Sequence, residues 1–328
     1  MRVTVIIPTR NRAGRIKEIL GCLCQQTVTP FEVITVDNDS SDKTKEVVLG
    51  FQGKLPVKYL LEKRKGPSFA RNTGIKEARG DFLIFLDDDI LVEKTFIEKM
   101  LTGFSWDGRY VFWPEIIFKF QKSNLASDFF LFFFEAKAKI QKLEWPILGE
   151  ISGFQITKGF HPSAFAIYKK DFLHLNSWFD EKIFSSFGEG PDLAIRLSLR
   201  GFTTILFDNI EVTNLTLRLD HSKLFTKSLL FGFIYIVLRT KFKKKKVNSK
   251  LGNLFENEIR IAGKKKINKI IMIIFNTFKK YWRKQSFFDK IVFPLFCLFH
   301  ALLIAIGLVY GLIFSGIHFK TGDKNAST

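Results

Sequence analysis

Short runs of apolar and β-branched residues alternate with helix-like segments over the first 90 residues, and this alternation constrains the fold most strongly. The runs 3–8, 31–36, 57–61 and 82–86 are predicted strands, of which 3–8 is expected to be buried and 82–86 is fully apolar. Between them, 15–25 carries apolar residues at helical spacing, and a second helix is expected at about 68–78. Strands joined by such helices form βαβ units around a parallel sheet. We therefore predict an α/β fold.

Polar residues cluster where three of these strands end. The first strand leads into 9–11, the second into 37–39, and the fourth into three consecutive aspartates at 87–89. In open α/β sheets the ligand site lies beyond the carboxyl ends of the strands. The pattern therefore predicts one crevice that is lined by all three clusters.

The aspartate triplet indicates a bound cation. If the chain is extended there, Asp87 and Asp89 face the same side and Asp88 points away. Mg²⁺ and Mn²⁺ take one or two carboxylates together with substrate phosphates. The alternative is a solvated turn in which the aspartates cap the next helix. Asp37 and Asp39 at a neighbouring strand end favour the metal site.

Four motifs in this order resemble family 2 glycosyltransferases. They are 5–11 (VIIPTRN), 36–42 (VDNDSSD), 70–75 (ARNTGI) and 85–89 (FLDDD). The resemblance covers residues 1–105 strongly and 160–210 more weakly. It implies a GT-A type, Rossmann-like, mostly parallel sheet flanked by helices, and a nucleotide-sugar donor, with UDP- or GDP-sugars expected.

The resemblance also implies roles for individual residues. Asp37 or Asp39 contacts the base, Arg71 lies near the nucleotide, and Asp89 holds Mn²⁺ or Mg²⁺ on the diphosphate. A cation and an arginine there would neutralise the charge of the leaving group. The complete expected nucleotide-sugar set is Pro8, Thr9, Arg10, Asp37, Asp39, Arg71, Asp87 and Asp88, and the expected metal set is Asp89, Asp87 and His221.

The stretch 187–193 (FGEGPDL) resembles the acceptor-side motif of the same family, with one departure. The family has Asp after Glu as general base, and this chain has Gly190. We expect Glu189 to accept the acceptor proton, which means inversion at the anomeric carbon. Asp192 is the substitute base, or a helix-start residue after Pro191. The Gln-x-x-Arg-Trp motif of processive synthases is absent, which favours addition of one sugar per visit.

The charge of the chain is concentrated at one end. Residues 221–328 hold 21 Lys and Arg against 4 Asp and Glu, out of 51 and 32 in the whole chain. Lysine clusters at 241–246, 264–266 and 279–284 alternate with apolar stretches, as in helices that lie on an anionic leaflet. Residues 291–317 contain no Asp, Glu, Lys or Arg, which predicts a transmembrane or re-entrant segment.

These features predict four regions. Residues 1–220 form the glycosyltransferase domain, with a nucleotide-binding half (1–105) and an acceptor-binding half (106–220). A mostly helical, membrane-associated C-terminal region follows, with basic interfacial helices at 221–285, the membrane segment at 286–319 and a polar tail at 320–328. Lysines before the segment outnumber those after it, so the catalytic part is expected in the cytoplasm, at the inner or cytoplasmic membrane. The phenylalanine-rich stretch 129–134 is either core or a lipid-touching lip.

The expected function is transfer of one sugar to a hydroxyl of a lipid-linked or cell-surface glycan. Two alternatives stay open. Gly190 allows a degenerate member that binds nucleotide or lipid without turnover. The basic region allows a nucleic-acid-associated membrane protein, although no nucleic-acid motif is present and we expect no nucleic-acid partner.

Overall fold

The structure, a computed structural model, divides into two compact units. One comprises 1–119 and 147–216, and the other 120–146 and 217–328. The predicted domain boundary at 220 lies close to Thr216, but 120–146 cluster with the second unit. The residues that the structure describes are 1–102, 108–120, 128–129, 132, 150–151, 154–157, 160, 162–173, 175, 177–182, 188–216, 233, 264–283, 293–295 and 297–302.

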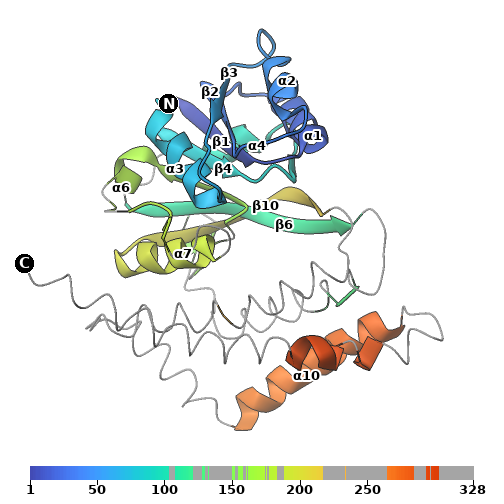
Figure 1. Ribbon diagram of the computed structural model, residues 1–328. Coiled ribbons are helices and arrows are strands. Elements are labelled where there is room, and N and C mark those ends of the chain that lie inside the picture. Colours follow the sequence, from blue (N-terminus) through green and yellow to red (C-terminus); the bar gives the residue numbers. More distant parts are fainter. Residues whose placement is uncertain are drawn as a thin grey trace, which may run out of the picture. The chain divides into compact units, whose positions relative to one another are not determined.

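The first 86 residues form the predicted βαβ units (Figure 1). The four strands lie in the order β3-β2-β1-β4, and β1 pairs in parallel with both β2 and β4. Helices connect them, as the periodicity predicts. The elements are β1 (Val3–Thr9), α1 (Ala13–Cys24), β2 (Glu32–Asp37), α2 (Thr44–Leu49), β3 (Val57–Leu61), α3 (Pro67–Glu77) and β4 (Phe82–Leu86).

The rest of the sheet is antiparallel, so the prediction of a mostly parallel sheet is wrong in this part. Beyond β4 the order continues β9-β6-β10-β8-β7, and β5 pairs with β10. The pairs β4–β9, β6–β9 and β10–β8 run antiparallel, which means that each strand in a pair runs in the direction opposite to its neighbour. These elements are β5 (Ile90–Val92), α4 (Phe96–Met100), β6 (Tyr110–Phe120), β7 (Glu150–Ile151), β8 (Phe154–Thr157), β9 (Ala164–Tyr168), α6 (Lys169–Leu173), α7 (Glu189–Leu199) and β10 (Thr203–Thr216).

Each face of the sheet has its own hydrophobic core. Along β1, Val5 and Ile7 contribute to one core, which includes the buried face of α1, and Ile6 contributes to the other. This alternation follows from the two-residue period of a strand. In the second core Phe85 of β4 stacks on Phe165 of β9 at 4.6 Å, and the two residues are register partners. The antiparallel half of the sheet is therefore fastened to the parallel half by aromatic packing.

The second unit contains α10 (Lys264–Arg283) and an aromatic cluster. Phe278 of α10 stacks on Phe293 at 5.6 Å, and Phe132 contacts Phe278, Tyr281 and Phe293. Within the described residues, no helix has both the length and the apolar character that crossing a bilayer requires. Most of the predicted membrane segment 286–319 lies outside the described residues, as does the polar tail at 320–328.

Candidate active site

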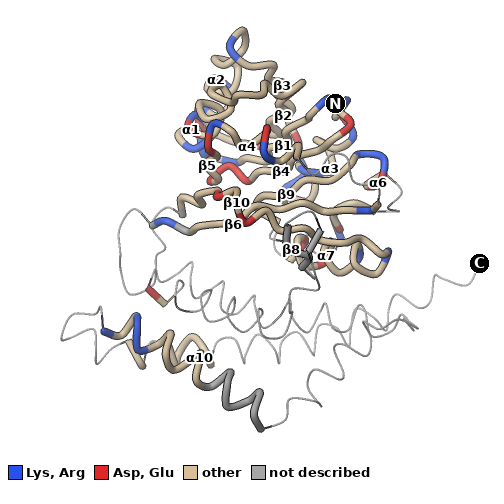
Figure 2. The backbone as a smooth tube through the Cα atoms, turned by 180° about the vertical axis from the view of Figure 1, so that it is seen from behind, with Lys and Arg blue, Asp and Glu red and all other residues tan. Residues whose placement is uncertain are grey.

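The polar residues that follow β1, β2 and β4 gather at one edge of the sheet, as predicted. Because β1 pairs with both neighbours in parallel, Thr9, Asp37 and the end of β4 lie at adjacent carboxyl ends. Figure 2 shows acidic stretches where β4 leads into β5. The loops after β1 and β2 are linked as well, since the Asn11 side chain accepts the Ser41 amide at 2.7 Å.

The acidic triplet is a turn between β4 and β5, not an extended strand end. The Ile90 amide donates to the Asp87 carbonyl at 3.1 Å, which closes the turn. The expected alternation, with Asp87 and Asp89 on one side and Asp88 pointing away, is therefore wrong. Instead, Asp88 and Asp89 both contact the guanidinium group of Arg12, and Asp87 contacts that of Arg71.

Arg12 is the cation shared by Asp88 and Asp89. Its Nη1 donates to Asp88 Oδ1 at 2.9 Å and to Asp89 Oδ2 at 3.2 Å. Thr9 Oγ1 donates to the second oxygen of Asp88 at 2.8 Å. Asn214 of β10 donates to Asp89 Oδ1 at 3.0 Å. The triplet is thus tied to β1, to the start of α1 and to the antiparallel half of the sheet.

Arg71 of α3 connects the two halves of the site. Its Nη2 donates to Asp87 Oδ1 at 2.6 Å, and its Nη1 donates to Glu189 Oε1 at 2.9 Å. The guanidinium also lies over the Phe179 ring at 5.2 Å, and it is only 5% exposed. Its Nε has no hydrogen-bond partner among the described residues. Asp87 and Glu189 are therefore held on either side of one buried positive charge.

Burial and ion pairing shift the pKa values of Asp88, Arg71 and Arg12. Loss of solvent raises the pKa of Asp88 to about 6, despite the opposing effect of Arg12. Burial acts to lower the pKa of Arg71, but Asp87 and Glu189 outweigh it and the pKa is raised. The same balance, with Asp88 and Asp89 as partners, raises the pKa of Arg12. Both guanidinium groups therefore stay charged.

The acceptor-side motif forms the start of α7. Gly188 precedes the helix with a φ of 94°, which glycine adopts without strain, and Glu189 is the first helical residue. Asp192 is fully buried and accepts Arg196 Nε at 2.8 Å. Arg196 in turn donates to the backbone carbonyls of Ser177 and Trp178. Of the two expected bases, only Glu189 belongs to the Arg71 cluster.

Gly190 has no room for a side chain. A Cβ built there would lie 2.3 Å from both Cβ and Cγ of Pro162. Pro162 is positioned by its neighbour Ser163, whose carbonyl accepts the Asp87 amide at 2.8 Å. Residues 162–163, which hold the acidic turn, therefore also occupy the space that an aspartate side chain would need at position 190, where the family that this motif resembles has an aspartate.

The two aspartates expected near the base differ in exposure. Asp37 is buried, and its oxygens accept the Ser40 amide at 2.9 Å and the Tyr59 hydroxyl at 2.8 Å. Asp39 is exposed and has a φ of 63°. Asp39 is thus the more accessible of the two. Of the remaining expected pocket residues, Pro8 is buried in β1 and Arg10 is exposed after it.

Sequence reasoning missed Arg12 and the role of Asn38. Asn38 donates to the carbonyls of Glu62 and Arg64 and accepts the Gly66 amide at 2.7 Å, so it holds the loop that leads into α3. Asn38 lies inside the motif 36–42, and Arg12 comes directly after the motif 5–11. Their place in or next to these motifs was the one feature of the sequence that could have identified them as site residues. The expected metal ligand His221 lies outside the described residues.

The chemistry of these side chains suits a divalent cation, although among the described residues no three His, Cys, Asp or Glu side chains are arranged to hold a metal ion. Asp87, Asp88, Asp89 and Glu189 are four carboxylates in contact with two guanidinium groups. Hard oxygen ligands are what Mg²⁺ and Mn²⁺ prefer. Asp87 and Asp89 remain about a quarter exposed, at 27% and 21%, whereas Asp88 is nearly buried.

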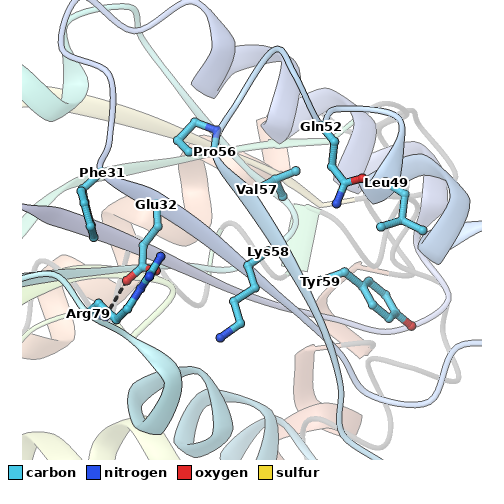
Figure 3. A pocket seen from close by; sticks show the side chains of 9 residues that line it. All are labelled: Phe31, Glu32, Leu49, Gln52, Pro56, Val57, Lys58, Tyr59 and Arg79. Carbon is cyan, nitrogen blue, oxygen red and sulfur yellow. Dashed lines mark hydrogen bonds and ion pairs between the residues drawn. The ribbon is translucent and has the colours of Figure 1, made fainter.

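A groove of about 470 Å³ includes Tyr59, whose hydroxyl donates to Asp37, among its lining residues (Figure 3). It is lined by residues at the beginnings of β2 and β3, among them Phe31, Glu32 and Val57, and by Arg79 after α3. The Arg79 side chain pairs with Glu32 at 3.4 Å within it. None of the expected site residues lines this groove.

The chain matches known proteins over the part that carries the site. The family model described as glycosyl transferase family 2 matches residues 4–171, just over half of the chain. An uncharacterized glycosyltransferase of Bacillus subtilis, YfnE, is 33% identical over an alignment of 139 residues, and the match covers 38% of this chain and 36% of that protein. The GalNAc(5)-diNAcBac-PP-undecaprenol beta-1,3-glucosyltransferase of Campylobacter jejuni is 28% identical over 188 residues, 56% of this chain and 57% of that protein.

Among solved structures, a mannosyltransferase from Pyrobaculum calidifontis in complex with GDP-Man and Mn²⁺ has the same fold. The TM-score is 0.61 at 15% identity, and the match covers 95% of this chain and 87% of that one. A likeness at this identity shows the GT-A-like fold alone. The chain spans less than two thirds of the length of either the Bacillus or the Campylobacter relative.

Proposed function

This chain belongs to glycosyl transferase family 2, and from that premise we propose that it transfers one sugar from a nucleoside-diphosphate sugar to an acceptor hydroxyl. The observation that carries the proposal is the Arg71 bridge between Asp87 and Glu189. It joins an acidic turn suited to the donor diphosphate with a carboxylate suited to proton abstraction. The products are the glycoside, the nucleoside diphosphate and one proton.

Asp89 is the proposed main ligand of the divalent cation that would neutralise the diphosphate as it leaves. Asp88, which shares Arg12 with Asp89, is a further candidate ligand, as are Asp87 and His221. Arg71, Pro8, Thr9 and Arg10 are proposed to orient the nucleotide, with Asp39, or Asp37 in its place, toward the base. The mannosyltransferase that was solved with GDP-Man and Mn²⁺ supports a nucleotide-sugar and metal requirement.

Glu189 is the proposed general base. Its carboxylate accepts the proton of the attacking hydroxyl, and a single in-line displacement inverts the anomeric carbon. Arg71 orients the Glu189 carboxylate by donating to its Oε1, and the other oxygen, Oε2, would accept the proton of the acceptor hydroxyl. Asp192 is the alternative base, but its burial and its bond to Arg196 suit a structural role better.

The acceptor is proposed to be a lipid-linked or cell-surface glycan, at an anionic membrane with the catalytic unit in the cytoplasm. The Campylobacter relative, whose name gives a polyprenyl-diphosphate-linked substrate, supports a lipid-linked acceptor. The charge of the C-terminal third supports membrane attachment, because lysines are in large excess over acidic residues there.

A second candidate is a binding protein of the same fold without turnover. Gly190 favours it, because Pro162 occupies the space of the missing aspartate side chain. If this candidate is right, the protein binds nucleotide and yields no product with any donor.

A transfer assay tests the proposal. The full chain is incubated with labelled UDP- or GDP-sugars and membrane lipid extract, with Mn²⁺, Mg²⁺ or EDTA. Label should pass to the lipid fraction in a metal-dependent manner. Asp89→Ala and Glu189→Gln should each abolish transfer, and Glu189→Gln should still bind nucleoside diphosphate. The control is Glu77→Gln, since Glu77 is an exposed residue paired with Lys58 away from the site. Unchanged rates in both test variants would overturn the assigned roles.

A further inference from the structure

The second unit exposes large apolar side chains to an extent that the first does not. Among the described residues, eight large hydrophobic side chains of the second unit are exposed, in the short stretches 272–282 and 295–302, whereas five are exposed in the much larger first unit. Exposed apolar groups concentrated in this way mark a surface that meets an apolar partner. The eight are Met272, Ile274, Phe275, Trp282, Leu295, Leu298, Phe299 and Leu302.

One side of α10 is already used for packing within its unit. Thr277 and Tyr281 are buried, and Phe278 stacks on Phe293. Phe132 packs against both Tyr281 and Phe293. These contacts fix which side of the helix faces the aromatic cluster, so the exposed side chains on the opposite side of α10 face outward.

The outward side combines apolar, aromatic and basic groups. Met272, Phe275, Lys279 and Trp282 follow one another at helical spacing and share a stripe, which we call the α10 outer face. Phe275 is 61% exposed and Met272 is 55% exposed. Arg283 lies one turn beyond Lys279. The helix contains no acidic residue, and Figure 2 shows its C-terminal end in the colour of Lys and Arg.

We infer that the α10 outer face, with the exposed leucines of 295–302, binds the surface of an anionic lipid leaflet and that α10 lies in the plane of that surface. Apolar side chains would enter the acyl boundary while the lysines meet lipid phosphates. The helix has seven Lys and Arg among its 20 residues, so it is too charged to span the bilayer.

Lipid suits this face better than nucleic acid or a second copy of the chain. A nucleic-acid backbone would satisfy the lysines but leave Phe275, Met272 and the leucines without an apolar partner. A second copy would bring together two faces that are both basic. The inference deepens the membrane part of the proposed function and does not depend on the catalytic roles of Asp89 or Glu189.

Vesicle flotation tests the inference without requiring turnover. The full chain is mixed with vesicles of phosphatidylcholine alone, or with one third phosphatidylglycerol. Wild type should float with the anionic vesicles and be released as salt is raised from about 0.1 to 1 M. Phe275→Glu should lower the bound fraction at least about tenfold, and Lys279→Gln should weaken binding and its salt dependence. Leu173→Glu, at a 48% exposed site of the first unit, is the matched control and should float like wild type.

Each contrary outcome overturns the inference. Equal flotation of wild type and Phe275→Glu would show that the face does not contact lipid. Concentration-dependent dimers in size-exclusion chromatography that Phe275→Glu disrupts, without flotation of wild type, would indicate a second copy. Binding to duplex DNA that competes with vesicles and is unaffected by Phe275→Glu would indicate nucleic acid. A melting temperature of Phe275→Glu equal to that of wild type verifies that the variant is folded. A failure of the protein to float would not change the result expected in the transfer assay. A failure of sugar transfer would likewise not change the result expected in the flotation experiment.

Discussion

Pro162 lies against Gly190 so closely that no β-carbon fits between them. A Cβ at position 190 would come within 2.3 Å of two ring carbons of Pro162, and that ring cannot swing away as a flexible side chain could. The glycine in the acceptor-side motif is therefore matched to its neighbour. Restoring the family's aspartate at this position should cost stability and should not raise activity.

Gly190→Ala should be destabilised by about 1–3 kcal/mol, the usual cost of overpacking a well-packed site. Gly21→Ala is the matched control, because Gly21 lies inside α1 and a Cβ added there would meet nothing within 4 Å. That change should instead stabilise the protein by roughly 0.5–1 kcal/mol. Urea unfolding of both variants measures the difference. A neutral Gly190→Ala would show that Pro162 yields easily.

Replacing Arg71 should destabilise the fold as well as abolish transfer. Arg71→Met leaves Asp87 and Glu189 without their buried cation, which costs about 3–5 kcal/mol for a buried pair. Lys58→Ala is the control, since it breaks an exposed pair with Glu77 and should change the stability little. Denaturant midpoints compare the two. Similar small losses would mean that the Arg71 bridge contributes little to stability.

Removing Arg12 should tighten Mn²⁺ binding to the protein in the absence of nucleotide. The guanidinium engages Asp88 and Asp89, so a metal ion must compete with it for these carboxylates. Arg12→Ala should raise Mn²⁺ affinity by about tenfold, since hydrogen bonds to charged groups contribute ~1.5–3 kcal/mol. Titration followed by Mn²⁺ electron paramagnetic resonance measures this. Arg2→Ala, which breaks an exposed pair with Asp81, should bind Mn²⁺ like wild type. Weaker binding by Arg12→Ala would contradict the competition.

Acid should weaken the fold partly through Glu62. The bond from Arg64 lowers the pKa of this carboxylate to about 2, and Thr73 adds a further donor. A lowered carboxyl pKa stabilises the folded state above the unfolded value of 4.5, and this contribution is lost as pH falls from about 4.5 toward 2.

Glu62→Gln should therefore show a shallower loss of melting temperature between pH 4.5 and 2 than wild type. Glu46→Gln, at an exposed position in the first turn of α2, should follow the wild-type curve. Parallel curves for wild type and Glu62→Gln would refute the role assigned to the Arg64 bond.

Local pattern predicted the parallel half of the fold well and the antiparallel half poorly. The strands at 32–37, 57–61 and 82–86 and the helices between them carry regular periodicity and end in polar turns. By contrast, β9 and β10 pair with strands far away in sequence, and their direction depends on packing such as Phe85 on Phe165. Of the stretch 129–134, Phe129 and Phe132 are described, and both belong to the second unit and contact aromatic residues more than 140 positions away.

The linear order of residues was enough to establish the family motifs, the carboxyl-end location of the site and the basic character of the C-terminal third. These depend on strand period, strand end and composition, all of which are local. The pairing of Arg12 with Asp88 and Asp89, the Arg71 bridge and the closed space at Gly190 depend on three-dimensional proximity. Each of these contacts joins residues that are 16 to 118 positions apart in the sequence. The opposite charges can therefore pair, and the side-chain volumes can fit together, only after the sheet has brought the residues close to one another.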